Sequence, residues 1–184
     1  MKLISQFILE SIDKGYKAAL DYVKGFTTNV NDFLRSGKVL ISKKEIDEAI
    51  SGLDSCFKDK YNKELYRTVD WNFMKNIFGI TRKNIDKHIG DILEDKGYMS
   101  TSKVNASPWG GSWMKDELVL VIQSDSYIKC FDVNKNIDKK EIDCAEQEEV
   151  LLPRGTKLEI TSYEIHKDKS CHKDGTYFIF CSIR

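Results

Sequence analysis

The chain has 184 residues, of which 41% are hydrophobic and 32% are charged, a composition typical of one compact globular domain with a proper core. The 29 basic and 29 acidic side chains cancel, so the chain lacks the basic excess that proteins working along nucleic acid usually carry. An apolar patch near the N-terminus is interrupted by Glu10 and Asp13, which makes it too short for a membrane span or a signal peptide.

The five cysteines are odd in number and include no Cys-x-x-Cys pair, and their spacing to the three histidines fits no zinc site. We therefore expect reduced thiols in a reducing compartment and no bound metal. We also expect a protein that is cytosolic, is delivered by another route, or lacks its leader in this form.

Three helices are predicted in the first third of the chain. Apolar residues recur at helical spacing over residues 1–24, and a second helix begins near Thr27 or Thr28 and ends before Ser36. Ser42 and Glu45 form a capping box for a third helix, which has an apolar stripe. We predict a single domain over residues 1–184, with residues 1–60 mainly helical and residues 61–184 rich in strands.

The rest of the chain mixes strands with short helices. Asp70 is a candidate cap for a helix from Trp71 to Phe78 that ends at Gly79, and a further helix is predicted over residues 82–95. Residues 132–145 read as a polar loop. Strands are predicted at residues 64–67, 96–102, 118–123, 127–131, 150–152, 157–166 and 175–182.

An acidic cluster, Glu146-Gln147-Glu148-Glu149, runs directly into the apolar strand Val150-Leu151-Leu152 and the break Pro153-Arg154-Gly155. A solvated acidic turn would explain it without any function. The alternative is a glutamate that points from the start of the strand into a cleft, with a partner two residues earlier, because residues i and i+2 of an extended segment share a face. The facing pair is then Gln147 with Glu149, or Glu146 with Glu148.

This stretch resembles the glutamate motif of mono-ADP-ribosyltransferase toxins, in which Glu-x-Glu or Gln-x-Glu precedes an apolar run and Pro-Arg. Anchored on the strand, the resemblance makes Glu149 the catalytic glutamate and Gln147 its partner, as in the clostridial exoenzymes that modify Rho GTPases. A slip by one residue would pair Glu146 with Glu148, as in arginine-modifying enzymes, and would turn every side chain to the opposite face.

Two further segments resemble the same family. Asn31 and Arg35 lie four residues apart on one helix face, which the residues alone explain as a polar outer face. Together with Tyr22-x-x-Gly25 they match a family pattern, and the resemblance implies that they hold the AMP half and the phosphates of NAD. Arg67 stands in a Tyr-Arg pair, where the resemblance implies a grip on the NAD phosphates or the nicotinamide ribose, since guanidinium matches phosphate oxygens.

The segment Gly97-Tyr98-Met99-Ser100-Thr101-Ser102 resembles the family's Gly-Phe-x-Ser-Thr-Ser. Alternation along a strand places Ser100 and Ser102 on one face, and the resemblance implies that Ser100 orients Glu149 and the ribose. Trp109, in the glycine-rich loop that follows, takes the place of a phenylalanine that packs near nicotinamide. Ser112 and Cys144 depart from the pattern, because the family has an arginine and an aromatic residue there.

The resemblance implies an α+β fold, with N-terminal helices packed on two opposed antiparallel β-sheets and an NAD cleft between them. It implies a mono-ADP-ribosyltransferase that consumes NAD without a metal and modifies an asparagine or glutamine of a host protein such as a Rho-type small GTPase. The alternatives are guanine in nucleic acid, protein arginine, or a catalytically silent binding module. We expect a monomer without a membrane segment, secreted or delivered as an effector into the cytosol of a target cell.

Overall fold

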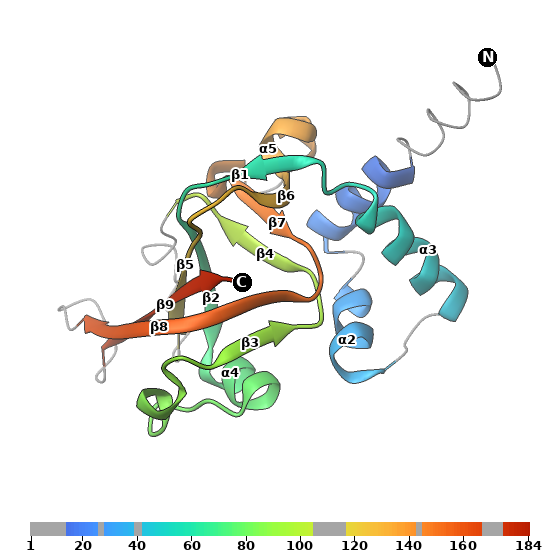
Figure 1. Cartoon of the computed structure of the whole chain (residues 1–184). Coiled ribbons are helices and arrows are strands. Elements are labelled where there is room, and N and C mark those ends of the chain that lie inside the picture. The colour runs from blue at the N-terminus through green and yellow to red at the C-terminus, as the bar shows by residue number, and fades with distance from the viewer. Residues whose placement is uncertain (1–13, 26–27, 39–41, 105–116, 143–144, 167–174) are drawn as a thin grey trace, which may run out of the picture.

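The helices at the start of the chain lie together on one side of a large sheet (Figure 1). The computed structural model describes residues 14–25, 28–38, 42–104, 117–142, 145–166 and 175–184. Helical residues 14–23 are followed by α2 (Thr28–Ser36) and α3 (Lys43–Asp54). The capping box between Ser42 and Glu45 is present, so the predicted start of the third helix is confirmed. None of the described helices is long and apolar enough to cross a membrane.

Within the described residues, nine strands form one continuous sheet in the order β1-β6-β7-β4-β2-β5-β9-β8-β3. The strands are β1 (Asp59–Tyr61), β2 (Leu65–Asp70), β3 (Ile92–Asp95), β4 (Met99–Ser102), β5 (Glu117–Gln123), β6 (Ile128–Asp132), β7 (Glu149–Leu152), β8 (Thr156–His166) and β9 (Thr176–Ile183). Except for β1, which the sequence did not indicate, and β3, they follow the predicted strand positions closely.

The α+β class with helices at the N-terminus is confirmed. The two expected sheets are joined into one, because β2 and β4 pair at Tyr66 and Ser102. The pair β5 and β9 departs from the expected antiparallel order: it is parallel, and β6, β7 and β8 lie between the two strands in sequence.

The helix predicted over residues 82–95 is wrong. The chain there forms a short 3-10 helix, η1 (Ile85–His88), and then strand β3. Gly90 has φ 91°, a left-handed value that ends the helical turn. Its N–H donates to the carbonyl of Ile160 at 2.7 Å, which brings the following residues into the sheet beside β8.

Side-chain caps explain the remaining short helices. Asp70 accepts the N–H of Phe73 and begins α4 (Trp71–Phe78), which ends at Gly79, as predicted. The polar loop predicted over residues 132–145 holds more local structure than expected. Asp132 caps α5 (Val133–Asn136), and Asp138 caps η3 (Lys139–Glu141).

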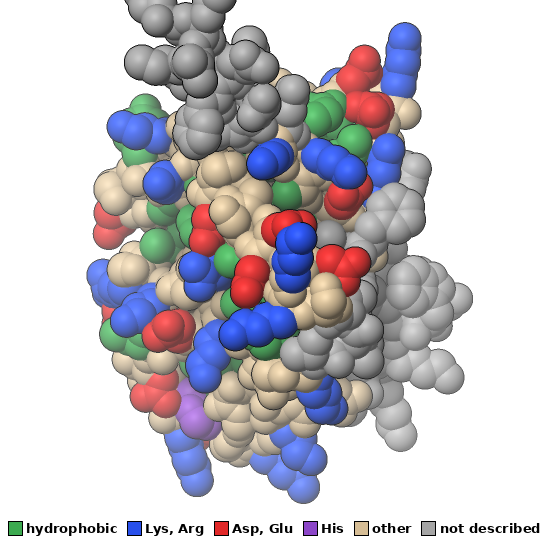
Figure 2. Space-filling model, turned by 90° about the vertical axis from the view of Figure 1, so that its right-hand side faces the viewer, with side chains coloured by type: hydrophobic (Ala, Val, Ile, Leu, Met, Phe, Trp, Pro, Cys, Tyr) green, Lys and Arg blue, Asp and Glu red, His purple; other side chains and the backbone are tan. Residues whose placement is uncertain are grey.

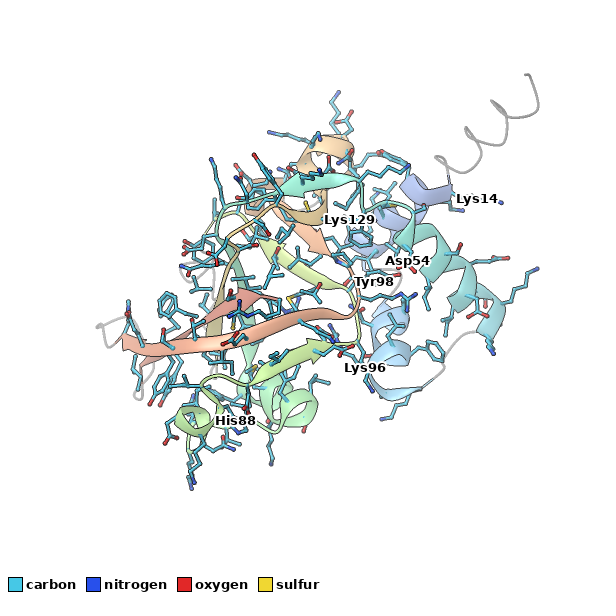
Figure 3. All side chains as sticks on the ribbon, viewed as in Figure 1. Lys14, Asp54, His88, Lys96, Tyr98 and Lys129 are labelled. Atoms are coloured by element: carbon cyan, nitrogen blue, oxygen red, sulfur yellow. The ribbon has the colours of Figure 1, made fainter. Side chains whose placement is uncertain are left out.

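Two apolar clusters hold the layers together. One joins α4 to every strand of the sheet from β6 to β3, and the other lies between the N-terminal helices and the sheet around β6 and β7. In the second cluster Tyr98, which is 0% exposed, stacks on Phe57 with ring centroids 5.7 Å apart. Its hydroxyl donates to Asp54 at 2.7 Å, so the residue before β4 is bonded to α3 (Figure 3). Full burial of one such side chain stabilises the fold by about 1.5–3 kcal/mol.

The described cysteines, Cys56, Cys130 and Cys181, carry free thiols. Cys130 and Cys181 are buried, and burial raises the pKa of both thiols, to about 11 and about 12. They therefore pack as small apolar side chains rather than as reactive groups.

Candidate active site

A serine and a glutamate meet where β7 begins beside β4. Ser102 lies opposite Glu149 in the antiparallel register, and Ser100 lies opposite Leu151. Alternation along the two strands therefore puts Ser100 and Glu149 on one face as diagonal neighbours. The hydroxyl of Ser100 donates a hydrogen bond to Oε1 of Glu149. The structure thus brings together the two residues that the sequence singled out for this position.

Glu149 is half-buried, and this position affects the pKa of its carboxyl. Burial raises the pKa of its carboxyl above the ordinary value, while the hydrogen bond from Ser100 and the charge of Arg67 lower it. The carboxylate is therefore partly removed from water. A charge in such surroundings acts on a nearby charge far more strongly than it would in bulk solvent.

Arg67 reaches the same place from β2. Its Nη1 donates to the carbonyl oxygen of Ser100 at 2.7 Å, and its guanidinium carbon lies 5.5 Å from the ring centroid of Phe73. Burial lowers the pKa of Arg67, while the nearby charge of Asp95 raises it. The Nε–H of Arg67 is buried and has no hydrogen-bond partner among the residues that the structure describes. A buried charged donor without an acceptor is costly, and it therefore points to a ligand with an acceptor oxygen.

Asn31 is bound to the main chain of Tyr98 through both ends of its amide. The N–H of Tyr98 donates to Oδ1 at 2.8 Å, and Nδ2 donates to the Tyr98 carbonyl at 3.1 Å and to the hydroxyl of Tyr22 at 2.7 Å. One side chain of α2 thus makes the hydrogen bonds that a neighbouring strand would make. In this structure Asn31 fixes α2 beside the strand that carries Ser100, and its contact with NAD stays a prediction.

Arg35 lies one turn further along α2 and pairs with Asp95. Its Nε and Nη2 each donate to a carboxylate oxygen of Asp95 at 2.8 Å, and Nη2 also lies 3.3 Å from the carbonyl oxygen of Tyr98. Burial lowers the pKa of Arg35, but the hydrogen bond and the charge of Asp95 outweigh burial, so the net pKa is raised. Its guanidinium carbon lies 5.3 Å from the ring centroid of Phe73, the ring that Arg67 also contacts.

Gly97 explains how α2 can approach so closely. A Cβ at this position would lie 2.6 Å from Oδ1 of Asn31 and 2.9 Å from Nε of Arg35, closer than side-chain atoms tolerate. Gly97 was predicted only as part of a motif, and Phe73 and Asp95 were not predicted as site residues. The mistaken helix over residues 82–95 also placed Asp95 in the wrong kind of element.

The turn before β7 is not extended, contrary to the prediction. Residues Ala145–Gln147 form the 3-10 helix η4, and Glu148 has φ 47°, so the strand begins only at Glu149. Alternate residues share a face only in extended backbone, and therefore Gln147 and Glu149 are not paired by strand geometry. Gln147 is exposed, and its main-chain carbonyl accepts a hydrogen bond from the hydroxyl of Ser102. A left-handed non-glycine residue costs about 1–3 kcal/mol, which the surrounding bonds must offset.

Three predicted or noted positions, Trp109, Ser112 and Cys144, lie outside the described residues. Within the described part of the chain, no group of three or more His, Cys, Asp or Glu side chains could hold a metal ion.

The described residues suit one kind of ligand. Two guanidinium groups and an unpaired buried donor fit a pyrophosphate, and a half-buried carboxylate fits a centre that becomes positively charged. A dinucleotide whose base leaves from a ribose carries both features. NAD is such a molecule, and the residues present therefore fit NAD as a substrate.

Comparisons with known proteins point the same way. The family model described as ADP-ribosyltransferase exoenzyme matches residues 6–179. Among curated proteins, none matches this chain. Among solved structures, the chain is similar to the Clostridium limosum C3 exoenzyme, with 19% identity and TM-score 0.70, over 93% of this chain and 85% of that one. It is similar to C3stau2 from S. aureus with NAD, with 23% identity and TM-score 0.66, over 97% and 92%.

A third structure is longer than this chain. The ADP-ribosylating toxin BECa of a binary enterotoxin of C. perfringens, with NADH, has 21% identity and TM-score 0.74. That match covers 93% of this chain and 43% of the toxin chain, so this chain spans less than half of that protein's length. Likeness at these identities shows the fold, whereas the family model covers nearly the whole sequence. The chain belongs to the ADP-ribosyltransferase exoenzyme family and so to the NAD-dependent mono-ADP-ribosyltransferases.

Proposed function

We propose that this protein cleaves NAD between nicotinamide and ribose and transfers ADP-ribose to an asparagine or glutamine side chain of a host protein. A Rho-type small GTPase is the first candidate target. The observation that carries the proposal is the half-buried carboxylate of Glu149, which accepts a hydrogen bond from Ser100 and lies within the electrostatic reach of Arg67.

In the reaction, the bond between ribose C1′ and the nicotinamide nitrogen breaks, and its electron pair leaves with nicotinamide. The pyridinium charge is neutralised in this step, so the leaving group needs no general acid. Positive charge develops on the ribose, and the Glu149 carboxylate stabilises it, while Ser100 keeps that carboxylate in place. The acceptor nitrogen then bonds to C1′ and loses its proton. Arg67 and Arg35 would hold the pyrophosphate.

Two features support Glu149, rather than Glu148, as the working glutamate. Glu149 is the residue bonded to Ser100, and it begins a regular strand. Glu148 is exposed and sits in a left-handed turn conformation.

Guanine in nucleic acid is the less favoured candidate for the group that accepts ADP-ribose. Binding to nucleic acid depends mainly on lysine and arginine placed against phosphates. The chain is neutral overall, and Figure 2 shows basic and acidic side chains interspersed on the helix-bearing face rather than a field of one sign. We further propose that the protein acts as a monomer in the cytosol of a target cell, after secretion or delivery.

The decisive experiment incubates the protein with labelled NAD and a host-cell lysate, and separately with purified Rho-type GTPases. We expect one labelled protein whose modified residue maps to asparagine or glutamine, with Glu149→Gln as the inactive control. Release of nicotinamide without transfer to any protein would contradict the proposed acceptor. Absence of nicotinamide release by the unmodified chain would leave only a silent binding module.

Gln147→Glu tests the acceptor assignment more sharply. Gln147 is exposed, whereas Glu149 is half-buried, so we expect the two to serve different partners. A carboxylate cannot donate to the acceptor's carbonyl oxygen as an amide does. Transfer to the native acceptor should fall by about 10²-fold or more, with nicotinamide release nearly unchanged. A parallel fall in both activities would assign Gln147 to the NAD site instead.

A further inference from the structure

Asp95 is a buried carboxylate behind the site, and nothing in the proposed reaction uses it so far. It is the last residue of β3 and is 1% exposed. Both of its oxygens accept hydrogen bonds from Arg35, and Oδ1 also accepts the N–H of Gly97 at 2.9 Å. A buried aspartate is stable only when it is paired in this way, so its position is tightly defined.

The two guanidinium groups of the site repel one another, and Asp95 opposes that repulsion. Arg35 and Arg67 contact the same Phe73 ring, at 5.3 Å and 5.5 Å from its centroid. The charge of Arg35 disfavours the charged form of Arg67, and the charge of Asp95 favours it. One aspartate thus allows two arginines to remain close together in surroundings that hold little water.

The hydrogen bonds of Arg35 leave Nη1 of its guanidinium for another partner. Asp95 accepts from Nε and Nη2, and Nη2 also donates to the carbonyl of Tyr98 at 3.3 Å. Within the described part of the chain, Nη1 makes no hydrogen bond. A guanidinium held along one edge keeps Nη1 in a fixed orientation, so Nη1 can donate to a phosphate oxygen with little loss of side-chain entropy.

We propose that Asp95 is a positioning residue for the NAD pyrophosphate: it fixes Arg35 by one edge, keeps it beside Arg67, and so sets the affinity for NAD without touching NAD itself. This inference rests on the proposed function, because it needs NAD as the ligand. A purely structural role is the competing explanation, since Asp95 also accepts the N–H of Gly97, and its carbonyl accepts the N–H of Gly155 at 2.8 Å.

The test compares Asp95→Asn with a matched control, Asp54→Asn. Asp54 also pairs with an arginine through two nitrogens, Arg154 Nε at 3.1 Å and Nη2 at 2.9 Å, and it also joins a helix to the end of a strand. Asparagine keeps an oxygen for the N–H of Gly97 but removes the charge. The readouts are the Kd for NAD, kcat and KM for nicotinamide release, and the melting temperature.

We expect both variants to melt at lower temperature, and only Asp95→Asn to raise the Kd and KM for NAD, by about tenfold, with a smaller change in kcat. The rise should disappear when Asp95→Asn is made in an Arg35→Gln background, because the residue acts through Arg35. Equal KM values in the two single variants would overturn the proposal. An undiminished effect in the Arg35→Gln background would do so as well.

Asp95→Glu covers the case in which Asp95→Asn does not fold. It keeps the buried charge and moves the carboxylate outward by one methylene, so the KM for NAD should rise while the charge balance is retained. An unchanged KM in this variant would refute the positioning role. If the unmodified chain and Asp54→Asn neither bind nor cleave NAD, the proposed function itself has failed. If both are active and Asp95→Asn matches them, only this inference has failed.

Discussion

The site has two halves that are positioned in different ways. Ser100, Glu149 and Arg67 lie on strands, where continuous ladders of backbone hydrogen bonds fix their register. Asn31 and Arg35 lie on α2, which is held by the second apolar cluster and by two side chains bonded to the short segment from Asp95 to Tyr98. The strand half is therefore insensitive to most single substitutions nearby, whereas the helix half depends on a few contacts.

This difference predicts how variants should separate. Changes in the strand half should affect the chemical step, because they alter the groups beside the reacting bond without moving the strands. Changes in the helix half should affect NAD affinity, because they let α2 shift away from the sheet. Four substitutions test the separation, in order of expected effect.

Glu149→Gln should have the largest effect. It removes the carboxylate that stabilises positive charge on the ribose, and loss of one electrostatic stabiliser lowers turnover by about 10² to 10³. The Kd for NAD should stay nearly constant, because the ladder between β4 and β7 is untouched. Single-turnover transfer and NAD titration measure the two quantities. Glu148→Gln is the control, and if it alone abolished transfer, Glu149 would be the wrong glutamate.

Arg67→Lys should lower kcat/KM by about 10- to 100-fold, because lysine cannot reproduce the planar fork. Arg67 lies on a strand but binds the carbonyl of Ser100 and offers an unpaired Nε–H, so it connects the two halves. We expect KM and kcat to change together, as steady-state kinetics of nicotinamide release would show. An unchanged KM for NAD would remove Arg67 from the substrate site.

Gly97→Ala should raise the KM for NAD by about tenfold and cost about 1–3 kcal/mol of stability, as overpacking usually does. The added methyl group would push against Asn31 and Arg35 and so displace α2. Gly52→Ala is the matched control: its Cβ would lie 2.6 Å from Cβ of Ala18, at a crowded helix contact outside the site. The control should lose stability without a change in KM, and identical kinetic behaviour of both variants would contradict the division into halves.

Ser100→Ala should have the smallest effect at neutral pH, about threefold to tenfold in kcat, since one hydrogen bond contributes about 0.5–1.5 kcal/mol. Burial already raises the pKa of Glu149, and the bond from Ser100 lowers it. Without that bond the pKa rises further, so the acid limb of the kcat/KM profile should move to higher pH. A shift toward lower pH, or none, would show that Ser100 does not bond to the working carboxylate.

The sequence predicted those elements whose signals are local. The capping box of Ser42 and Glu45, the Asp70 cap and the alternating strands all depend on neighbouring residues, and all were correct. Strand β3 was missed because its identity comes from pairing with β8, more than 60 residues away. The turn at Glu148 was missed because nothing in a run of carboxylates signals a left-handed residue.

The same distinction applies within the site. Motif resemblance singled out Ser100, Glu149 and Arg67, and the structure brings them together. Asp95 could not be found in this way, because its function depends on a side chain of α2 that is 60 residues away in sequence. Residues that act by holding other residues leave no pattern of their own in a single sequence.

The amide pairing between Asn31 and Tyr98 also has a consequence for folding kinetics. The two residues are 67 positions apart, and closing so long a loop costs entropy before any contact repays it. Because of this long closure, we expect the docking of α2 to come after the sheet has formed, with a φ-value near zero at Asn31. The same segment should open first in hydrogen exchange. Newly made chains would then possess a finished sheet before they possess a pyrophosphate site.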